Sequence, residues 1–169
     1  MKTVIILAMH GMPPNDFPQK ETLDYFMIHS RLENMPGPPP PQMQQQFEHL
    51  DSKMRNWPRT QENDLYSYTS HELAEVLSNQ TGHSVVVGFN EFCSPSLDDA
   101  FEKAIKQNPD KIIVVTPMMT QGGEHSEKDI PEAIERAKKK NLDIDYSFVW
   151  PFNNSKIATF LAEQIKEYY

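Results

Sequence analysis

Two histidines and one glutamate follow apolar, strand-like runs of this sequence, and together they could bind a metal ion. His10 ends "VIILAMH", Glu91 follows "SVVVGFN", and His125 follows "KIIVVTP" after a short glycine-containing loop. Two imidazoles and one carboxylate are a common ligand set for a divalent transition metal, and both groups can also accept protons. A single histidine is more often structural, so the hypothesis requires that the three side chains meet.

Four short apolar runs predict the strands that would bring these side chains together. They are rich in β-branched or aromatic residues and mostly do not alternate, which is typical of parallel strands buried on both faces. Helical patterns lie between them, so the predicted fold class is α/β, a three-layer, four-stranded parallel sheet of flavodoxin-like order 2-1-3-4 flanked by helices. Ligands of such sheets bind beyond the carboxyl ends of the strands, where the strand order reverses, so His10 and His125 should converge there. The predicted strands are residues 3–8, 84–89, 111–117 and 145–150.

Capping signals predict where the helices of this sheet begin and end. Serine, threonine and an acidic residue three positions later favour a helix start, and glycine or a basic turn favours a stop. The predicted starts are Thr69 with Glu72, Ser94 with Pro95, and Ser126 with Asp129, and the predicted stops are Gly82 and the run at 138–141.

The first crossover is longer than a sheet of this kind needs. Its proline run, "PGPPPP", cannot form the interior of a helix and is predicted to be an extended polyproline spacer. A helix-like piece follows and ends near Trp57. We predict a single domain over residues 1–169, with a Pro/Gln-rich helical insertion at about 35–60 that is too short for a core of its own.

Glycines beside the two histidines suggest close contact with a bulky ligand. Gly122 and Gly123 allow a sharp turn before His125, and the helix start that should follow offers N–H groups to a carboxylate. On the glycines alone, an ordinary strand-to-helix turn is the simpler interpretation. We take Gly11, Gly122, Gly123 and Ser126 as the predicted ligand-binding positions.

The remaining histidines and the single cysteine have no partner pattern. We interpret His29, His49 and His83 as surface residues. We interpret Cys93 as a small buried residue rather than a soft metal ligand.

Several known motifs are absent or incomplete. "HELAE" resembles the start of a zincin helix, but its fifth residue is Glu75 instead of histidine. No GxGxxG, GxxxxGK or GxSxG motif occurs. "MHG" resembles the start of a histidine phosphatase, but Met9 stands where those enzymes have an arginine, which argues against phosphoryl transfer through His10.

Composition narrows the classes of partner. The 169 residues carry a net charge of -8, which argues against nucleic acid as a partner. One cysteine excludes an intramolecular disulfide and fits a reducing cytoplasm, and no apolar run is long enough to cross a membrane. "VIILAM" is too short for a signal-peptide core, so we expect a cytoplasmic protein without a membrane partner.

Three segments together resemble the CbiX-type sirohydrochlorin cobaltochelatases, which are class II tetrapyrrole chelatases. They are "AMHG" after the first strand, "GFNEFCSPSLDDAF" after the second, and "VVTPMMTQGGEHSEKDIPEAI" after the third, and the resemblance covers residues 1–12 and 84–152. The chain departs from the family pattern at Met12 and Pro13, where Ser-Arg is usual, and at Ser94, where an acidic residue is often found.

The resemblance implies a lyase that inserts Co²⁺ into sirohydrochlorin during cobalamin biosynthesis, with Ni²⁺ or Fe²⁺ as the metals of relatives. By position, His10 and His125 would bind the metal or take the pyrrole protons, and Glu91 would complete the site. It also implies that no organic cofactor is needed, that a tetrapyrrole is the partner, and that the chain forms a homodimer. A tetrapyrrole or metal carrier on the same fold without turnover is the alternative, and a histidine-dependent phosphoryl-transfer enzyme is the third reading.

Overall fold

The sheet confirms the predicted fold class. The structure is a computed structural model that describes all residues 1–169. Its four strands run parallel in the order β2-β1-β3-β4. The elements are β1 (Thr3–Met9), α1 (Gln19–Glu33), α2 (Pro41–Arg55), α3 (Leu65–Thr81), β2 (Ser84–Phe89), α4 (Leu97–Ile105), β3 (Lys111–Val115), the π-helical turn η1 (His125–Asp129), α5 (Ile130–Lys140), β4 (Asp145–Phe148) and α6 (Asn154–Lys166).

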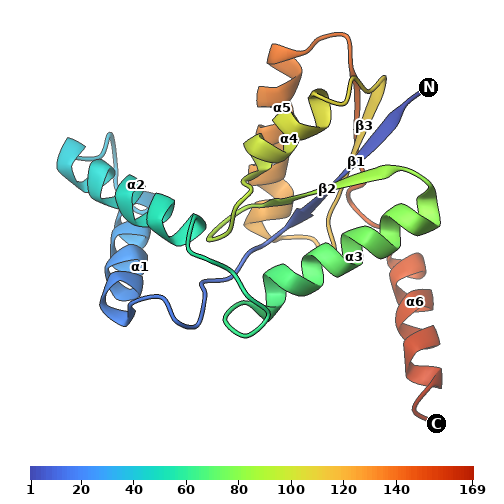
Figure 1. Cartoon of the computed structure of the whole chain (residues 1–169), viewed down its shortest axis with the longest axis horizontal. Coiled ribbons are helices and arrows are strands. Elements are labelled where there is room, and N and C mark those ends of the chain that lie inside the picture. Colours follow the sequence, from blue (N-terminus) through green and yellow to red (C-terminus); the bar gives the residue numbers. More distant parts are fainter.

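Side chains from alternate positions of β1 enter two separate apolar cores, which explains why this run lacks polar alternation. Val4 and Ile6 face the larger core, which α4 and α5 cover, whereas Leu7 and Met9 face a smaller core that includes Ala74 of α3. Figure 1 shows α4 and α5 together on one side of the strands and α3 on the other. The three layers leave the carboxyl ends of β1, β2 and β3 at one edge of the sheet.

The predicted helix stops are confirmed, whereas the predicted starts are wrong. Gly82 ends α3 in the left-handed conformation, and α5 ends at Lys140. The helix α3 begins four residues before Thr69, because the Asp64 carboxylate accepts a hydrogen bond from the Ser67 N–H and caps the helix there.

The start of α4 lies two residues later than predicted. Ser96 and Asp99 form a complete capping box, in which each side chain bonds the backbone of the other. Pro95 instead belongs to the loop after β2, since its carbonyl accepts a hydrogen bond from the Phe89 N–H. Ser126 and Asp129 do not cap α5, because they lie inside the π-helical turn that leads into it.

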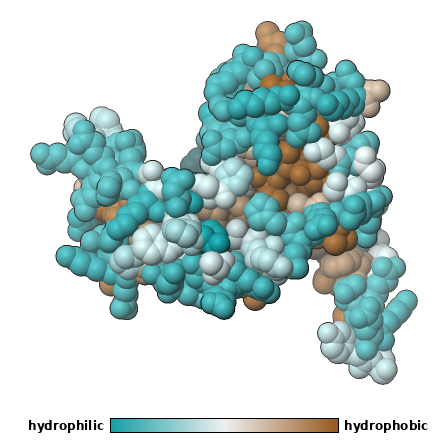
Figure 2. Space-filling view, viewed as in Figure 1, coloured by the Kyte–Doolittle hydropathy of each residue, from teal (hydrophilic) through white to brown (hydrophobic).

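The long first crossover forms an arm, which we define as α1, α2 and the connecting residues 34–40. Figure 1 shows the arm projecting from the sheet, and Figure 2 shows a notch between the arm and the body, with mostly hydrophilic atoms on the arm's visible face. Most of the proline run lies in the connection, and its last member, Pro41, starts α2, since proline is tolerated in a first helical turn.

The arm packs around a small core that it shares with residues outside it. Of the buried residues of this core, only Leu50 and Met54 lie within the predicted insertion at about 35–60, and the others come from α1 and from outside the arm. Its buried members are Phe17, Tyr25, Ile28, Leu50, Met54 and Phe92.

The last helix, α6, has no buried residue and extends away from the body, with the C-terminus at its tip (Figure 1). Phe160, Leu161 and Ile165 are each about half exposed on it. No helix combines the length and apolar character required to span a membrane.

Candidate metal site

The end of β1 and the loop after β2 are joined by main-chain hydrogen bonds. Met9 pairs with Phe89 at the ends of the two strands. Beyond this pair, the Asn90 N–H donates to the Met9 carbonyl at 2.9 Å, and the Glu91 N–H donates to the His10 carbonyl at 2.9 Å. Glu91 is therefore fixed beside His10 by an extension of the sheet pairing.

Gly11 makes this close approach possible. Its φ is +101°, and a Cβ built there would lie 1.9 Å from the Glu91 carbonyl oxygen. Any other residue would both strain the backbone and collide with Glu91. The structure thus gives Gly11 a place in the packing of the two site loops, whereas the sequence suggested contact with a ligand.

His125 reaches the same place from the turn after β3. It is the first residue of η1, so it lies inside the helical turn instead of before it as predicted. Its neighbour Ser126 is only 1% exposed and its hydroxyl makes no hydrogen bond, so Ser126 faces the interior rather than a ligand. The turn thus directs two successive side chains in opposite directions.

We call His10, Glu91 and His125 the inner triad. One possible ligand atom from each residue lies within 4.8 Å of the others. The two imidazole rings pack edge to face with centroids 4.6 Å apart, and His125 Nε2 is 3.9 Å from Glu91 Oε2. Small side-chain adjustments would place all three atoms at bonding distance from one ion.

Hydrogen bonds at Nδ1 orient both imidazoles of the inner triad. His10 Nδ1 lies 2.8 Å from the Gly11 carbonyl oxygen, which can only accept, so this nitrogen carries the proton in the neutral ring. His125 Nδ1 lies 2.6 Å from Asp129 Oδ2, one helical turn away. In both rings Nε2 keeps its lone pair for a metal, an arrangement usual for metal-binding histidines.

A cavity of about 510 Å³ opens beside the inner triad and is lined by polar residues alone. We call it the acidic cavity, because carboxylates outnumber its single lysine. Lys128 donates a hydrogen bond to Glu124, and this contact raises the pKa of the lysine. Such a lining attracts a cation more than an anion. The lining residues are His29, Glu33, Asn34, Glu91, Glu124, His125, Lys128 and Asp129.

The predicted glycine loop lies at the surface next to η1. Gly122 has a φ of +93°, and neither glycine has an atom within 4 Å of a Cβ built on it, so the space around both is open. The Gly122 N–H donates to Glu127 Oε1 at 3.2 Å, so this N–H already has a protein partner.

Sequence reasoning missed His29, which was predicted to be a surface residue without a partner. The structure places its Nε2 4.0 Å from Glu91 Oε1, in the acidic cavity. Glu33 follows one helical turn later and lies 3.6 Å from the same nitrogen. This i,i+4 pair was visible in the sequence, but nothing in the sequence placed its helix beside the strand ends.

The other histidines and Cys93 agree with their predictions. His49 and His83 are exposed. Cys93 is fully buried, and burial raises the pKa of its thiol from the ordinary 9.0 to about 11. Its Sγ lies 3.3 Å from Asp64 Oδ2, away from the inner triad's ligand atoms, so Cys93 belongs to the core.

Comparison with known proteins gives consistent matches. The sequence model of the CbiX family matches residues 62–168. A sirohydrochlorin cobaltochelatase from Saccharolobus solfataricus is 32% identical over 92 residues, which cover 50% of this chain and 71% of the relative. A sirohydrochlorin ferrochelatase from Priestia megaterium is 30% identical over 82 residues, which cover 48% of this chain but only 30% of the relative.

Among solved structures, the CbiX protein from Marinobacter aquaeolei VT8 has the same fold. The superposition has a TM-score of 0.56 and covers 98% of this chain and 95% of that protein, at 19% sequence identity. Since the family model spans more than half of the chain and includes two members of the inner triad, this chain belongs to the CbiX family.

Proposed function

We propose that this protein is a metal chelatase that inserts a divalent metal, foremost Co²⁺, into sirohydrochlorin or a closely related tetrapyrrole. The convergence of the inner triad is the observation that carries this proposal. The relatives named as sirohydrochlorin cobaltochelatase and ferrochelatase support the substrate class. The metal is a substrate in this reaction, and no organic cofactor is required.

The inner triad suits the first half of the reaction, in which an aqueous ion must lose water. The free Nε2 atoms of His10 and His125 and the carboxylate of Glu91 replace water ligands one at a time. Three protein ligands leave coordination positions open, which the ring nitrogens of the tetrapyrrole can fill.

The same side chains suit the second half, in which the macrocycle loses two pyrrole protons. An imidazole released from the metal can accept a proton at Nε2, because Nδ1 is already protonated and bonded elsewhere. The Asp129 carboxylate beside His125 Nδ1 would stabilise the imidazolium that results. No step requires a redox change.

The two substrates would contact different residues. The acidic cavity favours the cation and disfavours the carboxylate-rich macrocycle. Phe26 of α1 is 44% exposed and lies 5.7 Å from Phe92, which stacks on the His10 ring at 6.2 Å but is itself only 5% exposed. The exposed part of the Phe26 ring offers an apolar surface for a flat macrocycle.

Anaerobic absorbance spectroscopy of sirohydrochlorin with Co²⁺ tests the proposal. We expect the protein to accelerate the spectral conversion over the spontaneous rate, and His10→Ala and His125→Ala to remove most of the acceleration. His49→Ala, at an exposed histidine of the arm, is the matched control and should retain it. If the protein bound the ring tightly but did not accelerate insertion of Co²⁺, Ni²⁺ or Fe²⁺, it would instead be a carrier.

We also propose that the chain acts as a homodimer. The half-exposed apolar residues of α6 support this idea, because a helix without a buried residue gains stability from a partner surface. Light scattering coupled to size exclusion would give twice the 19.6 kDa chain mass for a dimer. A mass equal to one chain at micromolar concentration would contradict it.

A further inference from the structure

We propose that His29 of the arm is a fourth metal donor, which holds the incoming ion together with Glu91 on the outer side of the inner triad. This inference rests on the proposed function, because it describes how the metal substrate reaches the triad. It assigns the arm a part in metal delivery.

The two oxygens of the Glu91 carboxylate face two different histidines. Oε2 lies 3.9 Å from His125 Nε2, whereas Oε1 lies 4.0 Å from His29 Nε2. Two ligand atoms bound to one metal at about 2.1 Å each are typically about 3.4 Å apart. Both pairs are thus within a small adjustment of sharing an ion, one on each side of the same carboxylate.

The His29 ring is held in place by aromatic neighbours from both arm helices. It stacks on Tyr25 with centroids 5.8 Å apart and on Phe47 with centroids 5.5 Å apart, at interplanar angles of 16° and 22°. Its side chain is 28% exposed. This packing fixes the plane of the ring and leaves Nε2 directed at carboxylates, as a preorganised ligand requires.

A simpler interpretation is a surface histidine paired with Glu33 across one helical turn. That pair would explain the 3.6 Å distance between His29 Nε2 and Glu33 Oε1. It does not explain why the same nitrogen also approaches Glu91, which belongs to a loop of the sheet and is a member of the inner triad. Contact with two carboxylates from separate segments favours a cation position.

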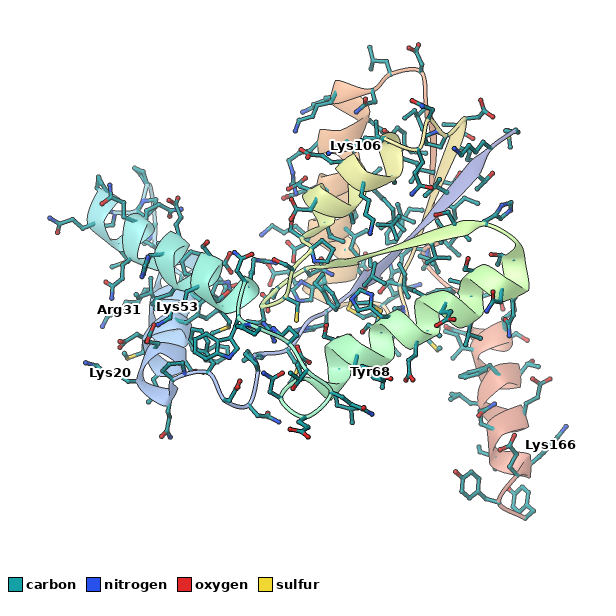
Figure 3. The ribbon with its side chains drawn as sticks, in the orientation of Figure 1. Lys20, Arg31, Lys53, Tyr68, Lys106 and Lys166 are labelled. Atoms are coloured by element: carbon teal, nitrogen blue, oxygen red, sulfur yellow. The ribbon has the colours of Figure 1, made fainter.

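The charges around His29 support delivery of a cation. Three carboxylates besides Glu91 line the acidic cavity, against one lysine that is bonded to Glu124. Figure 3 shows Lys20 and Arg31 on the outer side of the arm, and neither lines this cavity. The field therefore draws a divalent ion toward His29 and Glu91.

The delivery step is an exchange of ligands around Glu91. The ion first binds His29 Nε2 and Glu91 Oε1, and then moves to His125 Nε2 and His10 while the Glu91 carboxylate remains bound. Only coordination bonds form and break, so charge and protons balance without a further reactant. A carboxylate suits this role because its two oxygens can bind in turn or together.

The test is a titration with Co²⁺ alone, followed by the visible absorption of the bound ion. His29→Phe keeps an aromatic ring packed against Tyr25 and Phe47 but removes the donor nitrogen. We expect it to weaken Co²⁺ binding about tenfold and to change the spectrum of the bound ion. In turnover assays, KM for Co²⁺ should rise by a larger factor than KM for sirohydrochlorin. His49→Phe on α2 is the matched control and should change neither value.

Unchanged Co²⁺ affinity and KM in His29→Phe would overturn the inference, as would a wild-type protein that binds no Co²⁺ at millimolar concentration. If thermal unfolding shows that His29→Phe is misfolded, His29→Gln is judged by the same two values. Failure of the proposed function is separate, because it would appear as no acceleration of insertion by the wild-type protein.

Discussion

The sheet holds the inner triad mainly through the backbone, whereas the arm reaches the same site mainly through side chains. On the sheet side, consecutive N–H groups of Asn90 and Glu91 bond to consecutive carbonyls of Met9 and His10. These bonds depend on the strand register and only weakly on side-chain identity. The position of the triad is therefore a property of the fold.

The arm is attached through two arginines at the end of α2 and just beyond it. Arg55 donates to the carbonyls of Asn90 and Cys93 at 2.9 and 3.0 Å, and Arg59 donates to the Met12 carbonyl at 2.9 Å and to Asp64. The two arginines thus hold the loops that carry His10 and Glu91. Each bond is lost if one side chain is replaced, so the arm should be the easier half to detach.

Phe92 connects the two halves. It has a φ of +60°, a left-handed conformation that costs a bulky residue about 1 kcal/mol or more. Its ring is 5% exposed and packs against Tyr25 and Phe26 of α1 as well as His10. Burial of this aromatic ring offsets the backbone cost, so docking of the arm and the shape of the Glu91 loop depend on each other.

Replacing Gly11 should have the largest effect, because it disrupts the main-chain contacts that hold His10 beside Glu91. Gly11→Ala forces a Cβ to within 1.9 Å of the Glu91 carbonyl at a φ of +101°. We expect a loss of about 4 kcal/mol in the free energy of unfolding and loss of Co²⁺ binding, measured by urea denaturation and metal titration. Gly123→Ala is the control, since its Cβ meets open space, and a similar loss in that variant would refute the explanation.

Replacing Arg59 should have the next largest effect. It tests the attachment of the arm, which depends on side-chain hydrogen bonds. Arg59→Met leaves the Asp64 carboxylate, whose side chain is 1% exposed, without its ion-pair partner. We expect a loss of about 3 kcal/mol in the free energy of unfolding. The fluorescence of Trp57 should change at a lower urea concentration than a spectroscopic signal that reports on the sheet. Arg136→Met removes an ion pair to Asp98 that is about half exposed, and should cost below about 1 kcal/mol. If both variants lost the same free energy of unfolding, the buried Arg59–Asp64 ion pair would be no more important for stability than the exposed Arg136–Asp98 pair.

Replacing Asp129 should affect metal binding with little effect on the fold. Asp129→Asn removes the carboxylate that fixes His125 Nδ1, so we expect about tenfold to hundredfold weaker Co²⁺ binding. The midpoint of urea unfolding should change little, because the Asp129 side chain is 37% exposed. Glu124→Gln alters the same cavity without touching either histidine of the triad, and an equal loss there would point to cavity charge instead of His125 orientation.

The smallest effect concerns Cys93 at alkaline pH. Since its folded pKa is about 11, above the ordinary 9.0, the unfolded chain releases this proton first as the pH rises. Its contribution to stability is thus complete below pH 9 and is lost between about pH 9 and 11, amounting to about 1–2 kcal/mol. The difference in unfolding free energy between wild type and Cys93→Ala should shrink over this range. A constant difference would contradict the raised pKa.

The sequence by itself determined the sheet and the positions of the inner triad along it. Continuous apolar runs separated by helical patterns are typical of a parallel sheet buried on both faces, and the order 2-1-3-4 then places the residues after strands one and three side by side. His10 and His125 could be predicted because their positions follow from strand ends. Gly82 and Asn141 marked helix stops because C-terminal signals act locally.

Tertiary structure alone decided what the arm contributes. Its helices pack through contacts between distant segments, such as Tyr25 with Phe47 and Phe92, which no local pattern specifies. His29 looked like any exposed helical histidine, because its approach to Glu91 requires α1 to be docked by Arg55, Arg59 and Phe92. The physical reason is the distance along the sequence over which the interactions act. The end of a strand can be predicted from the burial pattern of one segment. Docking of the arm depends on side chains from distant segments, which meet only after the chain has folded.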